Sequence, residues 1–88
     1  MQATIKTYGR GSFATQADIF TIPLELAAEV VKHLDCRPGC YWESAAKAVR
    51  RAKRAKLTEV KLYTAGFGSD ALNTAIQAAG GTTVCLPD

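Results

Sequence analysis

The pattern of residues 58–86 restricts the fold of this chain more than any other part of the sequence. Residues 58–64 alternate between apolar and polar side chains, as in a strand with one buried face. A glycine-rich turn at residues 66–70 leads into a helical pattern, and a Gly-Gly pair then precedes a second strand at residues 82–86. A strand, a helix and a strand within about 30 residues form a β-α-β unit, whose two strands run parallel in one sheet.

The helix of this unit has a signal at each end. Ser69 or Asp70 is expected as the N-cap, because a short polar side chain accepts a hydrogen bond from an unpaired backbone N–H. Gly80-Gly81 provides the stop, since glycine readily adopts the left-handed conformation that ends helices. The face expected to be buried consists of Ala71, Leu72, Ala75, Ile76 and Ala79.

The first half of the chain predicts a hairpin followed by a helix. β-Branched and aromatic residues indicate strands at residues 3–8 and 13–22, and Gly9-Arg10-Gly11-Ser12 is expected to connect them. Pro23 opens the helix, where its missing N–H is not needed, and the Pro-Gly pair within residues 36–40 ends it. The apolar face of this helix comprises Leu24, Ala27, Ala28, Val31 and Leu34, widened by Leu26 and Val30.

A further helix at residues 43–56, with a buried side made almost entirely of alanine, completes the order β-β-α-α-β-α-β. The 88 residues are enough for only one domain. A chain of this length buries only about 60–65% of its unfolded surface, so its core is thin. We therefore expect a small single-domain α/β (α+β) sandwich over residues 1–88. It has a four-stranded mixed sheet, helices on one face or both, and the β-α-β unit at its C-terminal end.

The helix at residues 43–56 also holds the strongest functional signal. Residues 47–56 contain six of the eleven basic residues and none of the eight acidic ones. At about 100° per residue, four of the basic residues share one stripe of the helix and a fifth lies beside it, opposite the alanines. These five residues, which we call the basic ridge, are Lys47, Arg50, Arg51, Lys53 and Arg54.

An anionic partner suits the basic ridge. Lysine and arginine neutralise phosphates and release counterions, so the predicted function is non-catalytic binding of nucleic acid. Tyr41 and Trp42, directly before the helix, could stack on unpaired bases, although a Trp42 that covers the thin core is the simpler interpretation.

Two alternatives stay open for the basic ridge. One is a solvated helix face without a partner. The other is a small protein-binding regulator or inhibitor, of the phage or mobile-element type, that docks the ridge on an acidic protein surface. In that case the free edge of the N-terminal hairpin could add a strand to another sheet.

Residues 44–80 resemble a known family. An alanine-rich basic helix leads into a strand that ends in Gly-Phe-Gly-Ser (66–69), and the next helix closes with Gln-Ala-Ala-Gly (77–80). This order is similar to the C-terminal half of the ribosomal small-subunit platform protein, the eleventh of the small-subunit series. The resemblance implies an α/β fold and favours RNA over DNA, although Phe67 stands where that family usually has proline. It also implies a phosphate-facing turn formed by Gly66, Gly68 and Ser69.

Without the resemblance, the turn at residues 66–70 fits two interpretations. Backbone N–H groups at a helix N-terminus can hold an anion, but a plain turn with a helix cap needs the same residues. The turn has neither the Gly-Lys-Ser/Thr of a P-loop nor the third glycine of a dinucleotide-binding loop. Asp70 would also repel a phosphate bound there.

The cysteines and the single histidine have the ligand types of a tetrahedral zinc site. The set would be His33, Cys36, Cys40 and Cys85, but its spacing departs from the common zinc patterns. A Cys36–Cys40 disulfide or three free thiols is the simpler expectation, and we predict neither a metal nor a cofactor.

No residue set in the sequence indicates an enzyme. His33 lacks an activated nucleophile beside it, and the paired carboxylates Glu25 and Glu29 are more simply solvated. Residues 1–10 contain no apolar signal segment, and no apolar run approaches about 20 residues, so we expect a cytoplasmic protein without membrane contact. The thin core also allows a homodimer through paired sheet edges or alanine faces.

Overall fold

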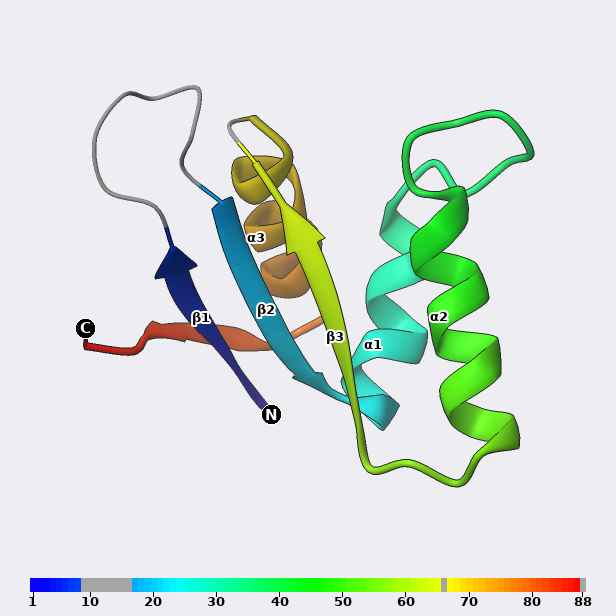
Figure 1. Cartoon of the computed structure of the whole chain (residues 1–88), viewed down its shortest axis with the longest axis horizontal. Coiled ribbons are helices and arrows are strands. Elements are labelled where there is room, and N and C mark those ends of the chain that lie inside the picture. Colours follow the sequence, from blue (N-terminus) through cyan, green and yellow to red (C-terminus); the bar gives the residue numbers. More distant parts are fainter. Residues whose placement is uncertain (9–16, 66, 88) are drawn as a thin grey trace.

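Figure 1 shows the computed structural model of the chain, which describes residues 1–8, 17–65 and 67–87. The elements are β1 (Gln2–Tyr8), β2 (Ala17–Pro23), α1 (Leu24–Val30), the 3-10 turn η2 (Val31–His33), α2 (Glu43–Arg54), β3 (Glu59–Thr64), α3 (Phe67–Ala78) and β4 (Thr82–Cys85). This order confirms the predicted small α+β domain with four strands and three helices. The hairpin connection predicted at residues 9–12 and the strand start predicted at residues 13–16 lie outside the described residues.

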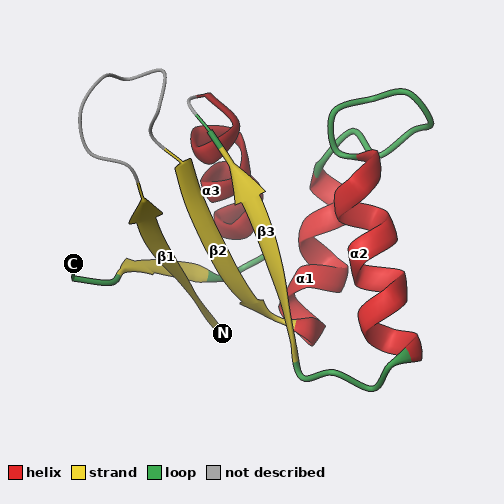
Figure 2. Ribbon diagram, viewed as in Figure 1, coloured by secondary structure: helices red, strands yellow, loops and turns green. Residues whose placement is uncertain are grey.

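The four strands form one mixed sheet in the order β3-β2-β1-β4. Figure 2 shows β3, β2 and β1 side by side. β2 pairs antiparallel with both β1 and β3, whereas β1 pairs parallel with β4. β3 and β4 therefore run in the same direction, as the β-α-β unit requires. They are not neighbours, because the N-terminal strands β2 and β1 lie between them.

This strand order makes one expectation wrong. The N-terminal hairpin has no free edge, because β1 pairs with β4 and β2 pairs with β3. The edges of the described sheet are β3 and β4 instead. Hydrophobic patterning marks which face of a strand is buried but carries no information on which strand is its neighbour.

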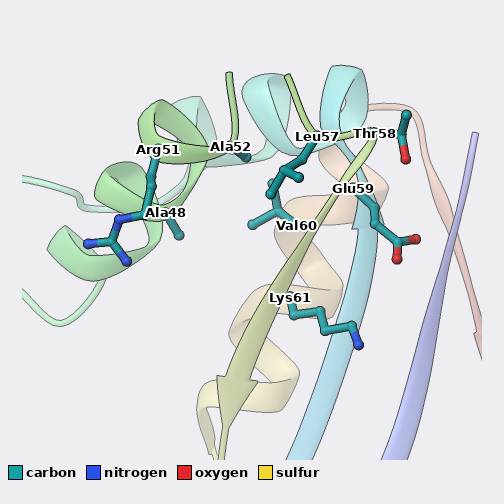
Figure 3. Close-up of a pocket in the computed structure, with 8 residues that line it drawn as sticks. All are labelled: Ala48, Arg51, Ala52, Leu57, Thr58, Glu59, Val60 and Lys61. Carbon is teal, nitrogen blue, oxygen red and sulfur yellow. The ribbon is translucent and has the colours of Figure 1, made fainter. Parts of the chain in front are cut away.

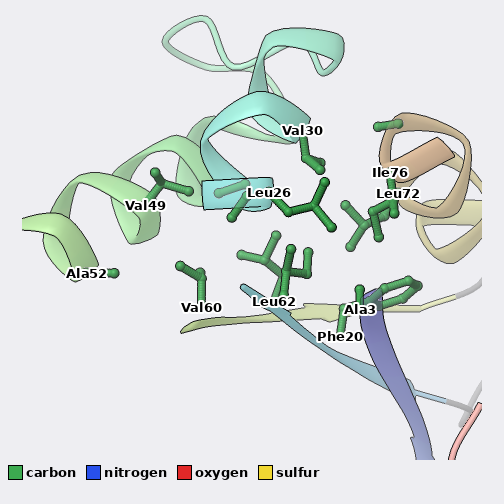
Figure 4. Packing of buried hydrophobic residues seen from close by; sticks show 14 residues of the cluster. Ala3, Phe20, Leu26, Val30, Val49, Ala52, Val60, Leu62, Leu72 and Ile76 are labelled. Carbon is green, nitrogen blue, oxygen red and sulfur yellow. The ribbon is translucent and has the colours of Figure 1, made fainter. Parts of the chain in front are cut away.

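The helices cover one face of the sheet (Figure 4). Alternate strand residues, among them Ala3, Phe20 and Leu62, share a single buried cluster with side chains from α1, α2 and α3. Phe20, Ile22, Val30, Leu72 and Ile76 are the largest side chains that are fully buried. Each such side chain stabilises the fold by about 1.5–3 kcal/mol relative to an exposed position. The opposite face of the sheet is open and carries Lys6, Tyr8, Lys61 and Tyr63 among its outward side chains.

The buried face of α1 is rotated from the predicted one. Leu26, Ala27 and Val30 are buried. Of the predicted centre of the face only Ala27 is therefore buried, whereas Leu24, Ala28, Val31 and Leu34 are partly buried. The reason is the position of α1, which contacts α2, α3, β2 and β3 and so faces the sheet with the residues expected at its flank.

α2 lies on the core with small residues, as predicted. Ala45, Val49 and Ala52 are buried, whereas Ala55 is exposed because the helix already ends at Arg54. Lys56 then adopts a left-handed conformation with φ of 57°. The Leu57 N–H donates to the Ala52 carbonyl oxygen at 2.9 Å, which forms the common helix-ending motif and turns the chain toward β3.

α3 begins earlier than predicted, at Phe67. Ser69 and Asp70 therefore lie inside its first turn and neither is the N-cap. At the other end, the predicted glycine stop is confirmed. Gly80 has φ of +84°, and the Gly81 N–H donates to the Ile76 carbonyl oxygen at 2.9 Å. Of the predicted inner face, Leu72, Ala75 and Ile76 are buried, Ala79 is half-buried and Ala71 is exposed.

Candidate nucleic-acid interface

The basic ridge occupies the solvent side of α2. Arg50, Arg51, Lys53 and Arg54 are all exposed, opposite the buried Ala45, Val49 and Ala52. A shallow hollow of about 210 Å³ lies between ridge side chains, and the four described residues that line it are Lys47, Arg50, Arg51 and Arg54. Because all four are cations and α2 contributes no carboxylate to this hollow, the local potential favours an anion.

One carboxylate meets the ridge at its N-terminal end. Glu43 pairs with Lys47 through a 3.1 Å contact between Oε1 and Nζ, and its Oε2 accepts the Gly39 N–H at 2.9 Å. The hydrogen bond from the Gly39 N–H lowers the pKa of Glu43 below its usual range, and the hydrogen bond and charge of Lys47 lower it further. Glu43 thus fixes the loop before α2 and occupies Lys47, which leaves the three arginines and Lys53 as the unpaired part of the ridge among the described contacts.

A groove runs between α2 and the edge strand β3 (Figure 3). It consists of two adjoining hollows of about 430 Å³ and about 480 Å³, and both are lined by Ala48, Arg51 and Lys61. Ala52, Leu57 and Val60 give the first hollow an apolar wall. We call the two hollows together the α2–β3 groove. The small alanines of α2 leave room for it beside the strand.

The second hollow of the groove is aromatic. Tyr41, Trp42 and Tyr63 all line it, from the loop before α2 and from β3. Tyr41 is 65% exposed and Tyr63 is 70% exposed. Trp42 is partly buried against the core, as its simpler interpretation predicted, and contacts Tyr41 edge-to-face with the ring centroids 4.8 Å apart. The hollow is therefore lined by two exposed tyrosines and one partly buried tryptophan.

Arg51 connects the groove to the basic ridge. This residue lines the hollow among the ridge cations and also both hollows of the α2–β3 groove. Lys61 also lines both hollows from β3, and its side chain extends from the strand away from α2 (Figure 3). The ridge and the groove consequently meet at Arg51, while Glu59 places one carboxylate among the residues that line the first hollow of the groove.

The predicted anion-binding turn lies at the start of α3, apart from the ridge helix. Gly66 lies outside the described residues. The Ser69 hydroxyl donates to the carboxylate of Asp18 and shares a 2.7 Å hydrogen bond with Thr64 Oγ1. At Gly68 a Cβ atom would lie 2.9 Å from the Tyr41 hydroxyl, so the missing side chain makes room for that ring. A carboxylate beside Ser69 disfavours a phosphate there, and the anion-binding turn stays a prediction.

The three cysteines are free thiols in two different settings. Cys36 and Cys40 lie half-buried in the loop before α2, and Cys85 is exposed on the edge strand β4. Burial raises the pKa of the Cys36 and Cys40 thiols. His33 is exposed in η2. Across residues 1–8, 17–65 and 67–87, no three His, Cys, Asp or Glu side chains come together in a way that could hold a metal ion.

Two residues of the surface were not singled out from the sequence. Lys61 and Tyr63 alternate with the buried Val60 and Leu62, so their outward direction was predictable. Their position beside α2 was not, because it follows from β3 being an edge strand.

Comparisons with family models, with curated proteins and with solved structures give no match for this chain. Within the described residues, no helix is both long enough and apolar enough to cross a membrane.

Proposed function

We propose that the protein is a non-catalytic nucleic-acid-binding module and that the basic ridge of α2 is its binding surface. The observation that carries this proposal is the hollow lined by Lys47, Arg50, Arg51 and Arg54, four cations on consecutive turns of one exposed helix face. Arginine can contact a phosphate through two N–H groups at once, and three of these four residues are arginines. The resemblance of residues 44–80 favours RNA over DNA as the ligand.

Contacts of this kind position a nucleic acid without reading its sequence. The affinity should therefore depend steeply on salt, because each neutralised phosphate releases counterions. With about four phosphate contacts, we expect affinity to fall by roughly a hundredfold between about 50 and 200 mM salt.

The test is binding of a short fluorescent RNA and a DNA duplex across a salt series. Charge reversal by Arg50→Glu with Arg51→Glu should abolish binding, while circular dichroism shows an unchanged fold because both side chains are exposed. Lys32→Glu with Arg37→Glu is the matched control, because it changes the net charge equally at two exposed cations outside the ridge. Binding that survives in the folded ridge variant contradicts the proposal.

A small protein-binding regulator or inhibitor is the second candidate, and the free edge of β3 favours it. The Leu24 N–H donates to the Thr58 carbonyl oxygen at 3.0 Å, and hydrogen-bonded pairs alternate along antiparallel strands. The backbone groups of Glu59, Lys61 and Tyr63 accordingly face away from β2, where an extended peptide could add a strand. A stoichiometric protein partner that survives nuclease treatment, with no nucleic-acid binding at low salt, would favour this candidate.

A further inference from the structure

We infer that the α2–β3 groove is a stacking site for the bases of a single-stranded nucleic acid, a specificity that rests on the proposed function of the basic ridge. The observation behind it is the distribution of aromatic side chains. The chain contains three tyrosines and one tryptophan. Three of these four residues, Tyr41, Trp42 and Tyr63, line the same hollow of about 480 Å³.

The exposure of these rings indicates a surface that meets a flat apolar ligand. Tyr63 is 70% exposed and Tyr41 is 65% exposed. Trp42 is held by its edge-to-face contact with Tyr41, with the ring centroids 4.8 Å apart, and by its packing against the core. A partly buried Trp42 beside the exposed Tyr41 and Tyr63 suits a nucleic-acid base, because each base has a π-face on which an aromatic ring can stack. Such stacking costs little conformational entropy, since it fixes few side-chain torsions.

The charges around the rings suit the backbone of the same strand. The described residues that line the aromatic hollow include two cations, Arg51 and Lys61, and no carboxylate. Arg51 also lines the hollow of the basic ridge. A strand whose phosphates follow the ridge would therefore reach Arg51 and then place its next bases against Tyr41, Trp42 and Tyr63.

An unpaired strand fits this arrangement better than a duplex or an acidic peptide. In a duplex the π-faces are covered by neighbouring base pairs, so the rings would meet only backbone and groove edges. An acidic peptide would satisfy the cations but would leave the aromatic hollow without a stacking partner. The combination of rings and cations thus selects single strands.

The experiment compares three labelled ligands by fluorescence anisotropy: a single strand of about ten nucleotides, the same strand with abasic sites in place of its bases, and a duplex. Each ligand is prepared as RNA and as DNA, so that the preference for ribose or deoxyribose is measured as well. We expect the intact strand to bind at least about tenfold more tightly than the abasic strand, which carries the same phosphates. Equal affinities for the two strands would overturn the inference.

Variants of Tyr63 locate the stacking. Tyr63→Ser should weaken binding of the intact strand by about tenfold to a hundredfold and leave the abasic strand unchanged, whereas Tyr63→Phe keeps the ring and the affinity. Tyr8→Ser is the matched control, because Tyr8 is an exposed tyrosine on β1, two strands away from β3 in the sheet. An equal loss for intact and abasic strands in Tyr63→Ser would contradict stacking.

The emission of Trp42 gives a second readout that needs no variant, since it is the only tryptophan in the chain. Its fluorescence should change on addition of the intact strand and not on addition of the abasic strand. The outcomes also separate this inference from the proposed function. If all three ligands bind equally and the ridge variant abolishes binding, the ridge function holds and the stacking site does not. If no nucleic acid binds at low salt, both fail, and a Trp42 change with an acidic peptide would indicate a protein partner.

Discussion

Gly81 packs directly against Leu26. A Cβ atom placed on Gly81 would lie 2.7 Å from Leu26 Cδ2 and 3.1 Å from Ile76 Cγ2. Leu26 and Ile76 are buried in the core, and Gly81 is buried between α3 and β4. The glycine therefore allows the end of α3 to approach α1 closely enough for β4 to reach the sheet.

Gly81→Ala should lower the free energy of unfolding by about 1–3 kcal/mol, because the added methyl group overpacks this contact. Urea denaturation measures the change. Leu26→Val removes part of the conflicting side chain, so Gly81→Ala should cost less in a Leu26→Val background. Strictly additive costs for the two substitutions would show that the two residues do not compete for this space.

Lys56→Gly should raise the free energy of unfolding by about 1 kcal/mol. Lys56 holds φ of 57° at the end of α2, a conformation that glycine adopts without the clash of a Cβ atom. Thermal unfolding followed by circular dichroism tests this expectation. Lys56→Ala is the control, since it removes the same charge but keeps the Cβ atom. An equal gain from alanine would assign the effect to charge and not to backbone strain.

Glu43 should make stability depend on acid pH. The Gly39 N–H and Lys47 hold the pKa of Glu43 below its usual range in the folded protein. A carboxyl group whose pKa is lower in the folded state stabilises the protein at pH values above its unfolded pKa of about 4.3. This stabilisation is lost as the pH falls through the folded-state pKa. The Tm of the native protein should therefore exceed that of Glu43→Gln at pH 7, and the two values should converge in acid. A constant difference from pH 7 down to pH 2 would contradict this linkage.

Glu43→Gln should also strengthen nucleic-acid binding at low salt. The substitution releases Lys47 from its 3.1 Å ion pair and removes the carboxylate nearest the basic ridge. We expect a gain of roughly twofold to fivefold in affinity and a steeper salt dependence, because one more cation can neutralise a phosphate. Glu25→Gln changes the net charge equally from the first turn of α1. The same gain in that control would attribute the effect to total charge.

Local patterns predicted most of the elements. The alternation of Val60, Leu62 and Thr64 placed β3, and the glycine pair after α3 placed its end, because both signals depend only on neighbouring residues. The start of α3 was missed, since Ser69 forms hydrogen bonds with Asp18 and Thr64 where a cap was expected. Asp18 is distant in the sequence, so no local pattern announces that contact.

The candidate site divides in the same way. Helical periodicity alone predicted the exposed side of the basic ridge, because Arg50, Arg51 and Arg54 are a turn or less apart. The α2–β3 groove depends on β3 lying at an edge with α2 beside it. The position of α2 beside β3 is a tertiary contact, so the sequence spacing of Tyr41 and Tyr63 could not predict that they line the same hollow.

The parallel pairing of β1 with β4 affects how the chain must fold. The Thr82 N–H donates to the Met1 carbonyl oxygen at 3.1 Å, and the Leu86 N–H donates to the Ile5 carbonyl oxygen at 2.8 Å. These contacts span nearly the whole described chain, so they belong to the slow, long-range class of folding events. Until β4 emerges from the ribosome, the nascent chain presents β1 as a bare strand edge that can pair with other molecules. Synthesis of β4 therefore ends the period in which the edge of β1 is exposed to aggregation.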